Sequence, residues 1–168
     1  MCFWMKKESS NIKSAKQLAE HCKTPKKVVA WVHRNIYYRK DRDVYNEADF
    51  WQDSCETLRI RTGDCEDFSV LISDALSEIG IASLIVGIVN DTGEAHAVCL
   101  YRIDGIWYAS SNWETLRCKK AQSLRETFQY IYSDWIKANI HKASNTSFGK
   151  NKPVQCIYRN IRLGGKYG

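Results

Sequence analysis

The sequence lacks any pair of cysteines separated by only two residues, although it contains seven cysteines. The missing Cys-x-x-Cys spacing argues against a zinc ribbon and against a thioredoxin-like redox site. Seven is also an odd number, and a chain of 168 residues is not a small scaffold that needs disulfides. We therefore expect reduced thiols, as in a cytosolic protein.

Long apolar runs are missing as well. The longest, residues 81–89, is far too short to cross a bilayer. The first apolar residues precede the lysines, which is the reverse of the order in a signal peptide. We therefore expect no membrane segment, a cytoplasmic location, and one domain over residues 1–168.

The chain is basic, with a formal net charge of +6 and a pI near 8.9, which raises the question of a nucleic-acid partner. The positive residues are spread over residues 6–27, 119–120 and 150–166, and no helix carries a dense basic stripe. This distribution favours an ordinary solvated surface, so we do not expect nucleic-acid binding. Nothing in the pattern indicates the oligomeric state.

Hydrophobic periodicity predicts helices first and a sheet after them. Helices are expected over residues 14–22, from Pro25 to about residue 36, over 64–80, and over 121–139. Strands are expected over 81–89, 95–103, 106–112 and 154–161, while 41–63 reads as irregular. The predicted class is α+β, with a core over about 27–113 and a helix and strand extension over 121–162. The 64–80 helix is expected to pack on an antiparallel sheet through one face, formed by Cys65, Phe68, Ile72, Ala75 and Ile79.

Among the cysteines, only Cys65 opens a predicted helix directly after a glycine-containing turn. Unpaired amides at a helix start favour a thiolate and can hold an oxyanion, which makes Cys65 a candidate nucleophile. The alternative is a small buried apolar residue beside ordinary capping carboxylates, and spacing alone leaves both open. Asp64, Glu66 and Asp67 oppose a thiolate unless amides, an arginine or a metal neutralise them.

A candidate base for this thiol is His96, the only one of four histidines at the start of a predicted strand. A two-residue turn at 104–105 would place Ser111 diagonal to His96 and Asn112 on the opposite face. An amide oxygen is the better acceptor for an imidazole N–H. We predict Asn112 as the residue that orients His96, and Ser111 is the alternative favoured by register.

Two blocks of the sequence resemble a known superfamily. Residues 51–58 (Trp-Gln-Asp-Ser-Cys-Glu-Thr-Leu) and 63–68 (Gly-Asp-Cys-Glu-Asp-Phe) are similar to the cysteine block of transglutaminase-like proteins, and most closely of bacterial transglutaminase-like cysteine peptidases. Residues 96–98 and 104–108 resemble the histidine hairpin of that family. The resemblance covers about residues 27–113 and implies a papain-like fold.

The same resemblance implies roles for individual residues. Cys65 would be the nucleophile and His96 the base, while the family's usual aspartate is replaced by Ser111, with Asn112 next to it. Trp51 is similar to a tryptophan whose indole N–H supports the oxyanion, but we expect it to pack in the core. Some members bind calcium through residues that correspond to Asp64 and Glu66, but those members work outside the cytosol, so we expect no cofactor.

The expected function is acyl transfer on a protein or peptide substrate. The Cys65 thiolate would attack an amide carbonyl, and His96 would protonate the leaving amine. Hydrolysis of the thioester makes a cysteine peptidase or amidase, which is the leading hypothesis. The alternatives are a transglutaminase, in which an amine is the acceptor, and a catalytically silent module that binds a peptide or a partner protein.

Overall fold

The computed structural model describes residues 11–112, 114–118, 126, 135–143 and 154–162. The helices are α1 Ala15–Cys22, α2 Pro25–Asn35, α3 Asp41–Tyr45, α4 Ser54–Ile60 and α5 Cys65–Glu78. The strands are β1 Tyr37–Tyr38, β2 Thr62–Gly63, β3 Ser83–Asn90, β4 Ala95–Ile103, β5 Ile106–Ser111, β6 Glu114–Cys118, β7 Trp135–Ala143 and β8 Val154–Arg162. Within these ranges, no helix has both the length and the apolar character to cross a bilayer.

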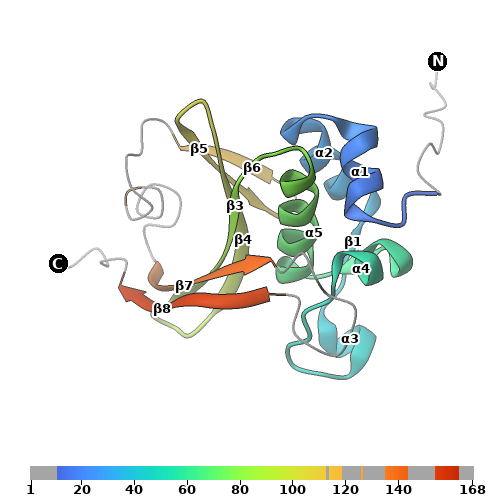
Figure 1. Ribbon diagram of the computed structural model, residues 1–168. Coiled ribbons are helices and arrows are strands. Elements are labelled where there is room, and N and C mark those ends of the chain that lie inside the picture. Colours follow the sequence, from blue (N-terminus) through green and yellow to red (C-terminus); the bar gives the residue numbers. More distant parts are fainter. Residues whose placement is uncertain (1–10, 113, 119–125, 127–134, 144–153, 163–168) are drawn as a thin grey trace, which may run out of the picture.

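The main sheet has six strands in the order β6-β5-β4-β3-β7-β8, and all of its neighbours are antiparallel. In Figure 1, α5 lies between this sheet and an outer layer formed by α1, α2 and α4. The α+β class predicted from the sequence is therefore confirmed. The predicted turn is confirmed too, because Ile103 pairs with Ile106 across it.

The core forms where α5 meets the sheet. Phe68, Ile72 and Ala75 recur at helical spacing along α5 and pack in one buried cluster with Cys99 and Tyr101 of β4. This is the face that the spacing predicts. The opposite face of the sheet has a second buried cluster, formed by Val86, Ile88, Val98, Leu100, Ala109, Ala138 and Ile140.

The helix predicted over residues 121–139 is wrong at its C-terminal end, because residues 135–143 form β7. Ala138 and Ile140 are buried, while Lys137 is exposed. This alternation has the period of a strand, and pairing with β3 stabilises it over the competing helical pattern. Most of residues 121–134, and the predicted loop at 144–151, lie outside the described ranges.

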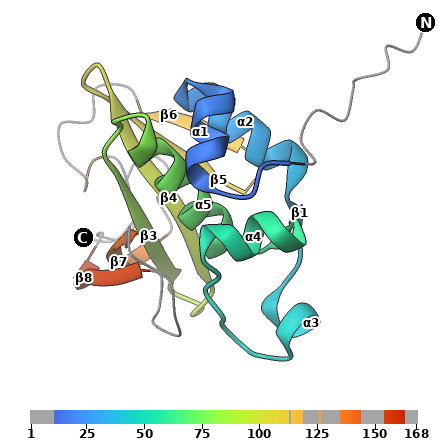
Figure 2. The ribbon, with the colours of Figure 1, turned by 45° about the vertical axis from the view of Figure 1, so that its right-hand side comes forward.

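Residues 41–63, expected to be irregular, contain two short helices and the short strand β2, which pairs with β1 just before this segment. The side chain of Asp53 caps α4 by accepting a hydrogen bond from the Glu56 amide at 2.8 Å. β1 pairs with β2 in parallel, so that Tyr38 lies beside Gly63. Figure 2 shows α3 set apart from the other helices, at the edge of the helical layer. These elements are too short for a periodic pattern to be visible in the sequence.

We expect Phe68→Ala to lower the free energy of unfolding by about 3–5 kcal/mol, because the ring is removed from a closely packed core. Urea unfolding followed by circular dichroism measures the change. Ser77→Ala, at an exposed position of the same helix, is the matched control and should stay within about 0.5 kcal/mol. Equal losses in the two variants would contradict the placement of this core.

Candidate active site

The start of α5 is anchored by the carboxylate of Asp67. Its Oδ2 accepts the Asp64 amide at 3.1 Å and the Gln52 side-chain amide at 2.6 Å, and its Oδ1 accepts the Gln52 backbone amide at 2.8 Å. Gly63 lies so close that an added Cβ would sit 2.6 Å from the Asp67 Cβ. The glycine before the cysteine is therefore required by this close approach. Together these contacts hold Cys65 in place.

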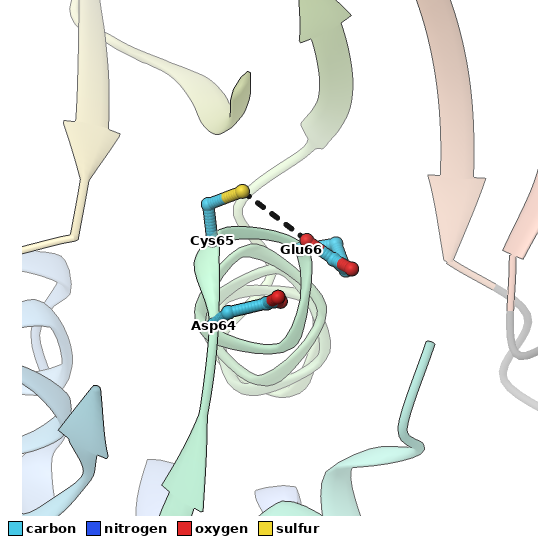
Figure 3. Close-up of side chains that lie close together, drawn as sticks. All are labelled: Asp64, Cys65 and Glu66. Carbon is cyan, nitrogen blue, oxygen red and sulfur yellow. Dashed lines mark hydrogen bonds between the residues drawn. The ribbon is translucent and has the colours of Figure 1, made fainter. Parts of the chain in front are cut away.

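The thiol of Cys65 lies next to a carboxylate. Sγ donates a hydrogen bond to Glu66 Oε2 at 3.1 Å, as Figure 3 shows along the axis of α5. Burial, and then the charge of Glu66, raise the pKa of the Cys65 thiol, and the backbone amide of Ala97 acts in the opposite direction. The favourable effect of the helix start is outweighed, so the thiol is protonated at neutral pH in this arrangement.

Five carboxylates form an acidic cluster at this end of α5. The cluster consists of Asp41, Asp49, Asp64, Glu66 and Asp67, and within it two all-carboxylate sets of three (Asp41, Asp64 and Asp67; Asp41, Asp49 and Glu66) have oxygens within 4.8 Å of one another. Asp41 Oδ1 and Asp64 Oδ1 are buried and accept no hydrogen bond. Burial raises the pKa of Glu66, and Asp64 raises it further. Crowded carboxylate oxygens of this kind have the chemistry that Ca²⁺ requires, so these residues fit a calcium ion.

His96 lies at the start of β4, half-buried, with its Nε2 2.7 Å from Ser111 Oγ. Burial lowers the pKa of the His96 imidazole, although Glu94 and Asp64 act to raise it. The ring is therefore neutral near pH 7 and can accept a proton. The hairpin register expected from the sequence favoured Ser111 as the neighbour of His96, and the structure contains this contact.

Asn112, predicted to orient His96, is placed differently. The chain reverses directly after β5, so that Ser111 pairs with Glu114, and Asn112 has a φ of 41°. Asparagine tolerates this left-handed conformation well, which explains its presence in the turn. Its Oδ1 is buried and accepts no hydrogen bond. The structure thus brings Ser111 to the imidazole and gives Asn112 a conformational role.

Cys65 and His96 line the same cleft, which has a volume of about 980 Å³. The Ala97 amide, adjacent to His96, acts on the Cys65 thiol, so the start of β4 lies against the start of α5. Tyr38 also lines the cleft, and burial followed by the nearby Cys65 raises the pKa of its hydroxyl to about 12. Sequence reasoning missed Tyr38 because only the short β1–β2 pairing places it there.

Trp51 and His141 form a further wall of the cleft. The indole Nε1 of Trp51 donates to Asp49 Oδ1 at 3.0 Å, and its ring centroid lies 5.0 Å from that of His141. The indole N–H, which the resemblance assigned to oxyanion support, is thus directed at a carboxylate here. His141 had no distinguishing sequence context, because β7 itself was predicted as part of a helix and a loop.

We expect Glu66→Gln to accelerate alkylation of Cys65 by iodoacetamide in the presence of EDTA at pH 11, where Glu66, whose pKa burial raises to about 10, carries its charge. Removing the charge of Glu66 lowers the pKa of the thiol, and each unit of pKa raises the thiolate fraction about tenfold. The rate at Cys65 is followed by mass spectrometry of its peptide. Glu78→Gln, at an exposed position at the other end of α5, should leave the rate unchanged. A slower rate in Glu66→Gln would contradict the inhibitory role of this carboxylate.

Comparison with known proteins places the chain in a family. The family model described as bacterial transglutaminase-like cysteine proteinase (BTLCP) matches residues 2–113, about two thirds of the chain. No curated protein matches the sequence.

Two solved structures of LapG from Legionella pneumophila have similar folds. The first has a TM-score of 0.51 and 16% identity, and the match covers 84% of this chain and 75% of LapG. The second, calcium-bound LapG, has a TM-score of 0.51 and 18% identity, with 80% and 78% covered. At these identities the similarity shows the shared fold, and the match to the family model carries the assignment. The protein whose cleft holds Cys65 and His96 belongs to the bacterial transglutaminase-like cysteine proteinase family.

Proposed function

We propose that the protein is a cysteine peptidase or amidase that cleaves an amide bond of a peptide or protein through a thioester on Cys65. The observation that carries the proposal is the shared cleft of Cys65 and His96, with the Ala97 amide reaching the thiol. A nucleophile at a helix start, a neutral imidazole and a fixed partner for that imidazole are the parts that thiol catalysis needs.

The proton movements follow from the contact between His96 and Ser111. Because Ser111 holds Nε2, the proton of the Cys65 thiol passes to Nδ1. The thiolate attacks the amide carbonyl, the carbon–nitrogen bond breaks, and the imidazolium returns its proton to the leaving amine. Amides at the start of α5 are placed to stabilise the oxyanion, and water then hydrolyses the thioester.

Ser111 acts in this mechanism as a positioning residue. Its hydroxyl fixes the ring of His96, but it carries no charge to stabilise the imidazolium that forms. The resemblance puts an aspartate at this position in related proteins. We therefore expect a slower enzyme than one with a carboxylate here, because the charged partner would favour the ion pair more strongly.

We further propose that the acidic cluster holds calcium, chiefly through Asp41, Asp64 and Glu66. Two buried carboxylate oxygens without partners support this, and LapG was solved in a calcium-bound form. A divalent cation held there supplies positive charge that offsets the carboxylates which raise the pKa of the Cys65 thiol. This proposal replaces the expectation of no cofactor, and it uses Asp64 and Glu66, the two residues that the resemblance pointed to.

A second candidate function is a silent module that binds peptides without cleaving them. The raised pKa of the Cys65 thiol and the uncharged hydroxyl of Ser111 beside the Nε2 of His96 favour it. The two candidates differ in one observable, the hydrolysis of peptide bonds. The cytoplasmic location and the single domain over residues 1–168 stay predictions.

Variants of Ser111 and Asn112 test which of these two residues orients the imidazole of His96. We expect Ser111→Ala to slow hydrolysis of a mixed octapeptide library by about tenfold, because a hydrogen bond worth about 1.4 kcal/mol is lost. Asn112→Gly keeps the positive φ and should stay within twofold of the wild type. Cys65→Ala and His96→Ala should abolish cleavage, which mass spectrometry of the products detects.

Two outcomes would contradict this assignment. A larger loss in Asn112→Gly than in Ser111→Ala would make Asn112 the orienting residue, as its chemistry first suggested. No hydrolysis by the wild type, with or without calcium, would leave the binding module as the function.

We expect calcium to raise the midpoint of thermal unfolding, because an ion that binds only the folded chain stabilises it by about 2.7 kcal/mol at one hundred times its Kd. EGTA should reverse the shift. Asp64→Asn should remove it, since this residue contributes a buried carboxylate oxygen without a hydrogen-bond partner, whereas Asp91→Asn in the exposed turn after β3 should not. An identical midpoint with calcium and with EGTA would refute the calcium site.

A further inference from the structure

The floor of the cleft beside the thiol is formed by a row of paired strand residues. Ala97 of β4 pairs with Gly87 of β3, and Gly87 pairs with Asn139 of β7. Directly paired residues project toward the same face of a sheet, and neighbouring strands are about 4.8 Å apart. Ala97 and Cys65 line the same cleft, and the Ala97 amide acts to lower the pKa of the thiol, so the row begins beside Cys65 and leads away from it.

Gly87 is not required by the backbone. Its φ lies outside the left-handed range that favours glycine, and it forms part of a regular strand paired on both sides. An added Cβ would meet only His141 Nε2, at 3.8 Å, which is an ordinary contact. The other glycine next to the site, Gly63, has no such freedom, because a Cβ there would collide with Asp67. The absence of a side chain at Gly87 therefore leaves space that belongs to the cleft.

The residues around this space determine which kind of substrate side chain can bind in it. Ala95, Val89 and Ala97 lie on the same face of the sheet and give the floor an apolar surface. Asn139 and His141 close it at the β7 side, and Trp51 packs on His141. Charged side chains line the cleft elsewhere, on α3 and around the start of α5. An aliphatic side chain is the chemistry that this floor favours, because it buries apolar surface without leaving a charge unpaired.

The distance between this space and Cys65 corresponds to the length of one substrate side chain. Gly87 lies one strand, about 4.8 Å, beyond Ala97. A side chain of the residue whose carbonyl Cys65 attacks spans a distance of this order. We propose that the space over Gly87 is a substrate subsite for one aliphatic side chain, and that Gly87 sets its depth. This inference rests on the proposed function of Cys65.

Affinity labelling with reagents of graded size tests the subsite. N-acetyl aminoacyl chloromethyl ketones derived from glycine, alanine, valine and leucine carry the side chain next to the reactive carbon, whereas iodoacetamide carries none. Calcium is present throughout, and the rate at Cys65 is separated from that at the exposed Cys55 by mass spectrometry. In the wild type we expect the leucine reagent to react at least tenfold faster than the glycine reagent.

Gly87→Ala should lower this leucine-to-glycine ratio by at least tenfold, because the new methyl group occupies the floor of the subsite. Its rate with iodoacetamide should stay within twofold of the wild type. Ala82→Val adds bulk at an exposed position just before β3 and serves as the matched control, with no change in either rate.

Every other result would contradict either the subsite or the proposed function of Cys65. An unchanged ratio in Gly87→Ala, with the iodoacetamide rate preserved, overturns the subsite and leaves the proposed function intact. Failure of Gly87→Ala to fold would show that the glycine serves the strand, which also overturns the subsite. If iodoacetamide modifies Cys65 no faster than Cys55 in the wild type, the proposed function of Cys65 fails and the subsite falls with it.

Discussion

The site depends on one buried carboxylate, that of Asp67. It accepts three N–H donors from Gln52 and Asp64, and thereby joins the segment before α4 to the first turn of α5. Burial raises the pKa of Asp67 to about 8, while the amide of Gln52 acts to lower it. A glycine is needed at position 63 because the side chain of Asp67 leaves no room there for a Cβ. Loss of this anchor would free the residues that carry the nucleophile, although none of these contacts involves Cys65 itself.

The charges around the nucleophile oppose its activation. A helix start favours a thiolate, yet Cys65 is buried and donates its hydrogen to Glu66. Burial is the larger cause, and the adjacent negative charge adds to it. In the proposed mechanism the Cys65 thiol stays protonated until positive charge is present nearby, either on His96 or on a cation bound by the acidic cluster. This balance is the physical reason for treating calcium and catalysis together.

The sheet supplies both the base and the floor of the cleft. The tight turn between β4 and β5 sets the register that brings Ser111 to within 2.7 Å of His96. The pairing of β3 with β4 and β7 places Gly87 between Ala97 and Asn139. Because side chains alternate along each strand, a shift of register by one residue would remove both features from the site. The contact between His96 and Ser111 and the proposed subsite over Gly87 therefore share one determinant, the strand register.

Local patterns in the sequence were sufficient to predict the fold class, the apolar face of α5 and the turn at 104–105, and to single out Cys65 and His96 as candidates. These features depend on residues close together in the chain. The strand β7 was missed because pairing with β3, about fifty residues earlier, overrides a helical pattern. The contact of Trp51 with His141, and the position of Tyr38 beside Gly63, also join segments that are far apart in the chain. Only the tertiary structure shows that Ser111 contacts His96 and that Asn112 lies in a left-handed turn, because this turn forms when β6 pairs with β5.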